Sequence, residues 1–418
     1  MTEPFHPPGT PEYAAFPLAA TAGPAGVFTA RSVGEVVRAV AAARRAGRPL
    51  RLTTTGLAMG RTAPLTGSLL LRPLLDAPIR VDPEARTAWV PAGRTWSDVL
   101  PETIPYGLTA VHGSSATAGV IGYLLGGGLS FYGRRFGLAA NTVRSLTLVL
   151  ADGSVVEASA THRPDLLWAL RGGGGGFGVV VAAEIELVPM HSVVTGTSLW
   201  DPADTPRVAP LWQAWSRTAP REITTRLRLL PVPSGRRVLA LDGAVVAPAA
   251  TDRAAARRIA DEMLSALVPP VAGTWAAVPP ETLVPAGPEP RAVRSDSALV
   301  RELDADIWAE LVAAGPGLLT LELRQLGGAL ATPAVSGGAL DSLAAPLLYY
   351  AAGPAGQLRA VRAALAPFLT GYTAPTFVEH FDLPQRTLDD YTRVRVERIR
   401  HDADPTGLFA GDIDAVRK

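Results

Sequence analysis

The chain has 418 residues, of which 48% are hydrophobic and 18% charged, so it can bury a substantial core and is too apolar for general disorder. Its 39 basic and 38 acidic residues give a net charge of +1, which provides no bulk electrostatic attraction for a nucleic acid. Cysteine is absent and the six histidines lack ligand spacing, so we expect no disulfide, no thiolate catalysis and no metal site.

Residues 1–28 are rich in Pro, Ala and Gly and predict an extended lead-in. No basic stretch precedes an apolar core there, so we expect no export signal, no membrane segment and a cytoplasmic protein. Ser32-Val33-Gly34-Glu35 is a capping box, and the valines that follow at helical spacing predict a helix that ends before Gly47. Strands are expected at residues 49–53, 69–71, 87–91, 145–150 and 179–187, with a hairpin turn at Asp152-Gly153.

This mixture of helices and strands predicts an α+β fold. It does not predict a Rossmann unit, because no strand leads into Gly-x-Gly-x-x-Gly with a helix and an acidic residue behind it. The loop after the strand at 49–53 offers consecutive amides in a tight turn, an arrangement that binds pyrophosphate. The alternative is a surface turn. The candidate cofactor-binding residues here are Thr53, Thr54, Thr55, Gly56, Leu57, Ala58 and Met59.

The most informative segment runs from Thr103 to Gly133, which contains no Asp, Glu, Lys or Arg and has glycine at eight positions. Glycine at this density allows the backbone to approach a flat or phosphorylated ligand closely. A short helix is expected from Ala118 to Leu125, with its free N-terminal amides facing an anion or a polar ring edge. The alternative is an ordinary buried loop. The cofactor-binding candidates are His112, Gly113, Ser114, Ser115, Thr117, Ala118, Gly119, Gly122, Tyr123 and Gly126, with Asn141 after them.

A second glycine cluster, residues 172–176, leads into the strand expected at 179–187. Here too the backbone is expected to pass close to a ring system or a phosphate, and a flexible loop is the alternative. The candidates in this segment are Gly175, Gly176, Gly178, Val179 and Val180.

These segments resemble the vanillyl-alcohol oxidase/p-cresol methylhydroxylase superfamily in its berberine bridge enzyme-like branch. The shared pattern is Gly-Ser-x-x-x-x-Gly-Val-x-Gly from Gly113, a glycine triplet at 126–128, and Arg-x-x-Gly-Leu-x-x-Asn ending at Asn141. The resemblance extends from about residue 30 to 189 and returns weakly after 318. It implies a two-domain flavin oxidase fold: an FAD-binding domain at 1–190, a substrate-binding domain at 191–381 with an antiparallel sheet covered by helices, and a segment at 382–418 that returns to the first domain.

The resemblance also implies that FAD is bound without a covalent bond. Leu57 stands at the position of the family's flavin-linked histidine, and Ser115 stands at that of the flavin-linked cysteine. Gly176 replaces an asparagine of the family pattern. Near the C-terminus the family places an Asn-x-Asn pair by the isoalloxazine, where this chain has Asp412 and Asp414. Asp412 is therefore a further cofactor-binding candidate, with a solvated carboxylate as the alternative.

The segment 318–329 alternates like a half-buried strand and places Thr320, Glu322 and Arg324 on one face. The resemblance implies that such a sheet covers the flavin and that its polar face lines the substrate cavity. A cross-strand ion pair on the surface is the alternative. The residues 347–353 are expected to pair with this strand. The candidates for the catalytic base are Tyr123, Glu322, Tyr349, Tyr350 and His380.

We therefore expect an FAD-dependent oxidoreductase, specifically an oxidase, that uses a small organic substrate and molecular oxygen. The high content of Ala, Arg and Pro suggests a GC-rich bacterial genome, and the family analogy suggests secondary metabolism. Two alternatives stay open: a redox-neutral flavoprotein that catalyses cyclisation or elimination, and a flavin-binding scaffold that has lost catalysis. The sequence does not indicate the substrate or the oligomeric state.

Overall fold

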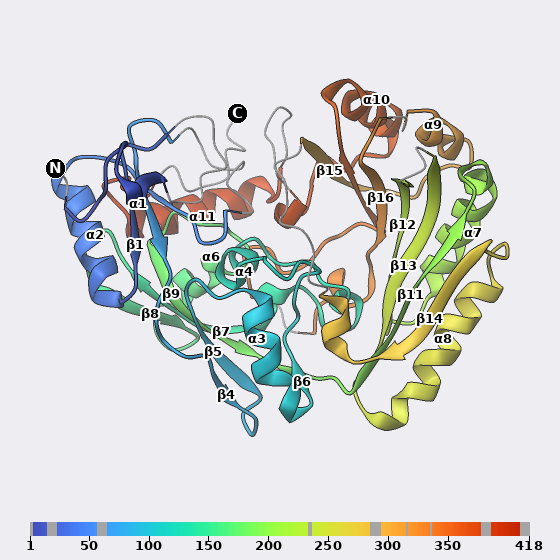
Figure 1. Ribbon diagram of the computed structural model, residues 1–418, viewed down its shortest axis with the longest axis horizontal. Helices are drawn as coiled ribbons and strands as arrows, with labels where there is room; N and C mark the ends of the chain where they lie inside the picture. The colour runs from blue at the N-terminus through green and yellow to red at the C-terminus, as the bar shows by residue number, and fades with distance from the viewer. Residues whose placement is uncertain are drawn as a thin grey trace.

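The computed structural model describes residues 3–14, 23–56, 65–232, 236–284, 294–314, 317–334, 337–377 and 386–409. These residues form two lobes that lie side by side (Figure 1). The N-terminal lobe contains the elements up to β10 together with the last helix, α11. The sheet lobe contains the elements from β11 to α10.

A small parallel sheet and one helix open the N-terminal lobe. Its strands lie in the order β1 (Gly26–Ala30), β3 (Leu69–Pro73) and β2 (Leu50–Leu52), and the short helix α1 (Pro11–Ala14) precedes them. Helix α2 (Val33–Arg45) begins where the capping box predicts, since Ser32 accepts a hydrogen bond from the Glu35 amide and Glu35 accepts one from the Arg31 amide. The predicted helix is confirmed.

A five-stranded antiparallel sheet forms the rest of the N-terminal lobe core, in the order β4 (Arg80–Asp82), β5 (Thr87–Pro91), β9 (Val179–Glu186), β7 (Val143–Val149) and β8 (Val155–Ser159). The predicted hairpin joins β7 to β8, and Gly153 there has a φ of +90°. The pair β6 (Leu108–Thr109) and β10 (Val188–Pro189) lies apart from this sheet. The helices of this part are α3 (Trp96–Thr103), α4 (Val120–Leu125), α5 (Gly133–Phe136) and α6 (Pro164–Leu170).

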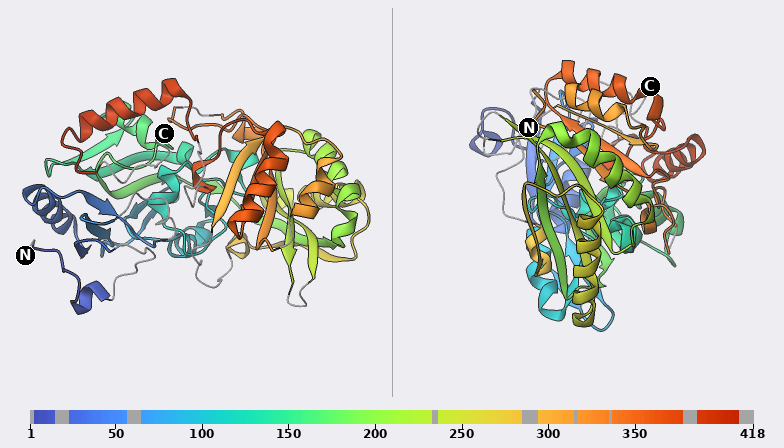
Figure 2. Two further views of the ribbon diagram at one scale, coloured as in Figure 1. Left: turned by 90° about the horizontal axis from the view of Figure 1, so that it is seen from above. Right: turned by 90° about the vertical axis from the view of Figure 1, so that its right-hand side faces the viewer.

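The sheet lobe is built on one seven-stranded antiparallel sheet. The strand order is β14 (Ala272–Val278), β11 (Ser192–Trp200), β13 (Arg237–Ala247), β12 (Ile223–Pro231), β16 (Thr320–Gln325), β17 (Leu347–Ala352) and β15 (Ser295–Val300). Four helices cover one face, as Figures 1 and 2 show: α7 (Thr205–Thr218), α8 (Arg253–Ser265), α9 (Ile307–Ala314) and α10 (Ala355–Leu365). The other face is directed toward the N-terminal lobe.

The last helix, α11 (Asp390–Ala403), returns to the N-terminal lobe. Its residues Val396 and Ile399 are buried in the same core as α6, and Phe409 beyond it is fully buried. Arg395 lies 3.8 Å from the ring centroid of Trp168 on α6. The α+β class and the two-domain arrangement are thus confirmed, whereas the domain limits at 190 and 381 stay predictions.

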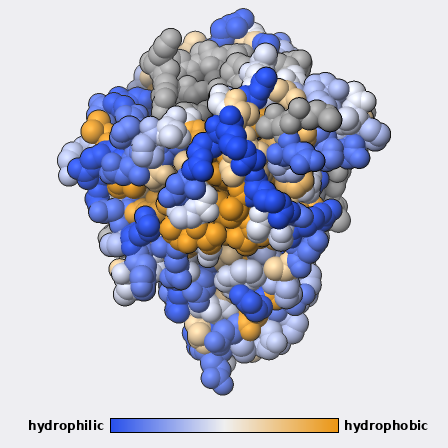
Figure 3. All heavy atoms as spheres, turned by 90° about the vertical axis from the view of Figure 1, so that its left-hand side faces the viewer, coloured by the Kyte–Doolittle hydropathy of each residue, from blue (hydrophilic) through white to orange (hydrophobic). Residues whose placement is uncertain are grey.

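Short 3-10 helices connect the larger elements: η2 (Ile104–Tyr106), η3 (Ala139–Thr142), η4 (Pro202–Asp204), η5 (Ala250–Asp252), η6 (Pro280–Leu283), η7 (Gly328–Leu330), η8 (Ala366–Phe368) and η9 (Pro375–Phe377). Within the described ranges, no helix has the length and apolar composition that a membrane-spanning segment needs. The outer surface of the N-terminal lobe is mostly hydrophilic around a central hydrophobic area (Figure 3).

Candidate functional site

The first two candidate cofactor segments meet at Gly119. A β-carbon on Gly119 would lie 2.8 Å from Oγ1 of Thr54 and 3.6 Å from Cγ2 of Thr55, so only glycine allows the two segments to approach this closely. Strand β2 directs the threonine loop to this point, and Arg72 holds it there by donating a hydrogen bond to the Thr54 carbonyl. Three other candidates of the loop, Leu57, Ala58 and Met59, lie outside the described residues.

Helix α4 begins at Val120, two residues later than the sequence predicts. The backbone before it is engaged elsewhere: the Trp96 amide donates to the Ala118 carbonyl, and the Val120 amide donates to the Arg94 carbonyl. These bonds hold Gly119 in an extended conformation as the N-cap of the helix. The prediction that Ala118 belongs to the helix was therefore wrong, because pairing with the segment before α3 competes for its backbone.

The second glycine cluster lies at the other end of α4. The Gly174 amide donates to the carbonyl of Leu125, and φ is positive at Gly172, Gly174 and Gly176. Arg400 of α11 donates to the carbonyls of Gly173 and Gly175 at 2.9 and 3.1 Å. Val179 and Val180, which follow the cluster, are buried in β9. All three candidate cofactor segments therefore converge around one short helix.

Polar side-chain atoms without partners are buried beside this convergence. The ring of Tyr123 is enclosed by backbone, since β-carbons on Gly113 and Gly128 would lie 2.9 and 2.5 Å from its carbon atoms. The hydroxyl of Tyr123 and the Nε2 atom of His112 have no hydrogen-bond partner in the described part of the chain. Because a buried polar atom is costly when it stays unpaired, this pattern favours a polar molecule bound at the site.

Burial keeps both of these groups neutral. It lowers the pKa of His112 to about 4, and the hydrogen bond between its ring and the Gly113 carbonyl only partly offsets the effect. Burial also raises the pKa of Tyr123 far above its usual value, although the positive charge of Arg324 opposes this shift. Tyr123 is therefore a neutral hydrogen-bonding group at neutral pH, which argues against it as the base.

The sheet lobe directs its polar face toward this region. Glu322 and Arg324 point from β16 to the same side as Arg226 and Arg228 of the neighbouring β12, because cross-strand register pairs Arg226 with Arg324 and Arg228 with Glu322. Thr320, the third predicted substrate residue, lies at the start of the strand and is only partly buried. Glu322 and Arg324 are 4% and 3% exposed, so the surface alternative for this pair was wrong.

Register also separates the two tyrosines of β17. Tyr350 pairs with Glu322 and shares its face, whereas Tyr349 pairs with Leu323 and is fully buried among the covering helices. Tyr349 is thereby excluded as a catalytic candidate, because its side chain lies on the wrong side of the sheet. His380 lies outside the described residues, as does Asp412.

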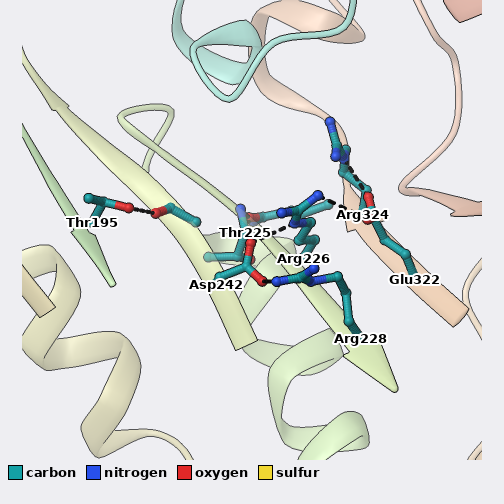
Figure 4. Close-up of polar contacts among 9 residues, drawn as sticks. Thr195, Thr225, Arg226, Arg228, Asp242, Glu322 and Arg324 are labelled. Atoms are coloured by element: carbon teal, nitrogen blue, oxygen red, sulfur yellow. Dashed lines mark hydrogen bonds and ion pairs between the residues drawn. The ribbon is translucent and has the colours of Figure 1, made fainter. Parts of the chain in front are cut away.

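Ion pairs join the polar residues of this face into one network (Figure 4). Arg226 contacts Oδ1 of Asp242 at 2.5 Å and Oε2 of Glu322 at 3.1 Å. Arg324 donates to Oε1 of Glu322 at 2.8 Å, and Arg228 donates to Oδ2 of Asp242 at 2.7 Å. Burial opposes the ionisation of Glu322, but the three arginines outweigh it and hold its pKa below the usual value. Glu322 is thus an ionised structural partner and a poor candidate for the base.

Two aromatic rings lie against the network, and one of them, Phe131, belongs to the N-terminal lobe. Phe131, which follows the glycine triplet, lies 5.0 Å from the guanidinium carbons of both Arg226 and Arg324. Phe377 lies 4.9 Å from that of Arg324, with its ring centroid 5.5 Å from that of Tyr350. The sequence analysis missed Arg226, Arg228, Asp242, Phe131 and Phe377. Of these residues, only Arg226 and Arg228 could have been found from the sequence, because they alternate along one strand.

Other candidates have different roles or stay predictions. Asn141 donates to the carbonyl of Asp341 at 2.9 Å, so its side chain supports a neighbouring segment, and its role toward the cofactor stays a prediction. Ser115 lies 3.2 Å from Oγ1 of Thr117, and Ser114 is exposed. A β-carbon on Gly122 would meet nothing within 4 Å. No group of His, Asp or Glu residues that could hold a metal occurs in the described part of the chain.

Comparison with known proteins agrees with this geometry. Residues 24–159 match a family described as FAD binding domain. The chain is 32% identical to (R)-6-hydroxynicotine oxidase of Paenarthrobacter nicotinovorans over 173 residues, which are 41% of this chain and 38% of that protein. It is 33% identical to berberine bridge enzyme-like C-1 of Nicotiana tabacum over 165 residues, 37% of this chain and 28% of that one. The matches thus span less than half the length of these curated relatives.

A solved structure extends the likeness to the whole fold. The wild-type BBE-like 1 protein of Physcomitrella patens superposes with a TM-score of 0.82 at 19% identity, covering 98% of this chain and 96% of that one. Residues 24–159 thus match an FAD-binding domain, and the whole chain has the fold of this berberine bridge enzyme-like protein. The matched domain contains the threonine loop and the glycine-rich run, and the glycine cluster at 172–176 lies against the same helix.

The residues of the matched FAD-binding domain fit FAD. Gly119 allows the threonine loop to lie directly against the glycine-rich run, and the unpaired atoms of His112 and Tyr123 supply polar partners. The residues that would hold the cofactor are the threonine loop, the run from Gly113 to Tyr123 and the glycines at 174–176.

Proposed function

We propose that this chain is an FAD-dependent oxidase that acts on a small organic substrate between its two lobes. The observation that carries this proposal is the contact of Phe131 with Arg324, which joins the FAD-binding domain to the buried polar face of the sheet lobe. A molecule held there would lie between the cofactor segments and Tyr350.

In the proposed reaction the substrate loses a hydride from carbon and a proton to a base, and oxygen takes up the two electrons and two protons to form hydrogen peroxide. Bound FAD supplies the hydride acceptor. The chain supplies orientation, exclusion of water and the proton acceptor. Tyr350 is the candidate base best placed among the described residues, because Tyr123 is held neutral, Glu322 is ion-paired and Tyr349 faces the helices.

Anaerobic mixing tests this function. Small alcohols and amines, beginning with (R)-6-hydroxynicotine, are mixed with the flavinated protein, and flavin absorbance is recorded. Bleaching by a compound and recovery on admission of air support an oxidase. Conversion without bleaching identifies a redox-neutral enzyme, and the absence of both leaves a scaffold.

Tyr350→Phe is expected to slow flavin reduction about 10²- to 10⁴-fold, the usual contribution of a positioned acid or base, with FAD content unchanged. Tyr349→Phe is the matched control, because this neighbour lies on the other face and its hydroxyl has no partner in the described part of the chain. Equal reduction rates in the two variants would remove Tyr350 as the base.

We also propose that FAD is bound non-covalently, since Leu57 and Ser115 occupy the positions of both attachment residues. Acid precipitation is expected to release the yellow chromophore into the supernatant. Flavin that stays on the washed pellet would contradict this prediction.

A further inference from the structure

We propose that Arg226, Arg228 and Arg324 form a binding site for the carboxylate of an organic substrate with an apolar or aromatic body. This inference rests on the proposed function, since it takes the molecule bound there to be the substrate.

The charge balance of the network supports an anionic ligand. Among the described residues it contains three guanidinium groups and two carboxylates, those of Asp242 and Glu322, which leaves one positive charge in excess. Glu322, Arg324 and Asp242 are buried, and Arg226 and Arg228 are partly buried. Because an uncompensated buried charge is costly, a ligand with one negative charge would complete the network, and a cationic amine would be disfavoured.

The hydrogen bonds lead to the same conclusion. Each of the four carboxylate oxygens already accepts from an arginine: Asp242 from Arg226 and Arg228, and Glu322 from Arg226 and Arg324. The terminal amino groups of Arg324 donate to no acceptor in the described part of the chain, since only its Nε is engaged. A planar guanidinium with both terminal groups open suits a carboxylate.

The arginine network can be reached by a solute, and it lies beside two phenylalanine rings. The side chains of Arg226 and Arg228 keep 19% and 22% of their surface exposed, so a solute can reach them. Figure 4 shows Arg324 extending away from β16, and its guanidinium carbon lies 5.0 Å from the ring centroid of Phe131 and 4.9 Å from that of Phe377. An apolar body attached to the carboxylate would therefore contact aromatic surface, close to the glycine-rich run that includes Tyr123.

Titration of the FAD-loaded protein with benzoate and with benzamide, its neutral analogue, tests the site by calorimetry or by perturbation of the flavin spectrum. Benzoate is expected to bind at least tenfold more tightly than benzamide. Arg324→Met is expected to weaken benzoate binding about 10- to 100-fold, the range for hydrogen bonds to a charged group. Glu322→Gln is expected to strengthen it, because the excess positive charge rises from one to two.

The opposite signs of these two effects separate binding from damage to the fold. Arg217→Met is the matched control: it removes an exposed arginine of the same lobe, paired with Glu302, and is expected to leave benzoate binding unchanged. If Arg324→Met does not fold, Arg228→Gln replaces it, with an expected severalfold loss.

Equal affinity for benzoate and benzamide would overturn the proposal, as would a loss of benzoate binding in Glu322→Gln similar to that in Arg324→Met. A shifted flavin potential in Arg324→Met with unchanged benzoate affinity would also overturn it and assign the charge to the cofactor. Benzoate binding requires no turnover. Intact binding in a protein that no compound reduces would therefore count against the oxidase proposal alone.

Discussion

Replacement of Gly119 by valine is expected to weaken the binding of FAD, so that the purified protein loses part of its flavin. Gly119 has φ −69° and ψ 130°, values open to any residue, so backbone strain does not explain why glycine stands there. The hydrogen that a side chain would replace faces Thr54 and Thr55, and a β-carbon would lie 2.8 Å from Oγ1 of Thr54. Valine would push the threonine loop away from the glycine-rich run and separate two of the three segments that hold the cofactor.

The expected loss of FAD affinity follows from the cost of overpacking. That cost is about 1–3 kcal/mol, which corresponds to roughly 5- to 100-fold weaker binding of FAD. The measurement is the flavin-to-protein absorbance ratio of the purified variant and its dissociation constant for added FAD. Gly34→Val in α2 of the same lobe is the control, since a β-carbon there meets nothing closer than 3.9 Å. A folded Gly119→Val protein with full flavin content would show that the run does not hold FAD.

Gly127, in the same glycine-rich run, is a poorer position than Gly119 at which to test FAD binding. It has a φ of +88°, and its β-carbon would lie 2.9 Å from Leu340, a residue that follows the sheet lobe strand β16. Valine at this position strains the backbone and the packing between segments at once. A loss of FAD in Gly127→Val would therefore report on folding as much as on the cofactor.

The sequence was sufficient where the signal is local. A capping box and a period of 3.6 residues specify α2, and alternation places Glu322 and Arg324 on one face of β16, as the structure has them. The glycine-rich segments were also recognisable, because few other functions need glycine at that density. The sequence could not show whether Tyr349 or Tyr350 faces the network. Both lie in a continuous apolar strand, and only pairing with β16 fixes which one does.

The features that the sequence did not predict depend on partners that are distant along the chain. Arg226 and Asp242 come from strands β12 and β13, far from β16 in sequence, and no pattern in one strand predicts the partner of a charge in another. The start of α4 was misplaced for a similar reason, because the segment at Arg94 and Trp96 competes for its first residues. The role of Arg134 is a third example: the sequence marks it as a family motif residue, but its acceptors lie in two distant segments, 219–223 and Leu326.

Loss of the Arg134 side chain is expected to destabilise the chain strongly. It lies on α5 of the N-terminal lobe, is 4% exposed, and donates to carbonyls of the sheet lobe. Its Nε donates to Ile223 at 2.8 Å, its Nη2 donates to Ala219 at 2.8 Å and Pro220 at 3.2 Å, and its Nη1 donates to Leu326. Burial and the charge of Arg221 lower the pKa of Arg134 to about 10, despite Glu222, so the group stays charged at neutral pH.

Arg134→Met keeps much of the side-chain volume but leaves four carbonyl groups without this donor. Buried acceptors that lose a charged donor cost about 1.5–3 kcal/mol each, only partly additively, so we expect the free energy of unfolding to fall by about 3–5 kcal/mol. Urea denaturation followed by tryptophan fluorescence measures the change. Arg135→Met is the matched control: the next residue pairs with Glu222 at 3.6 Å on the surface and is expected to change stability by less than about 1 kcal/mol. Equal denaturation midpoints for the two variants would show that Arg134 does not hold α5 against β12 and β16, and the placement of Phe131 beside Arg324 would then depend on packing alone.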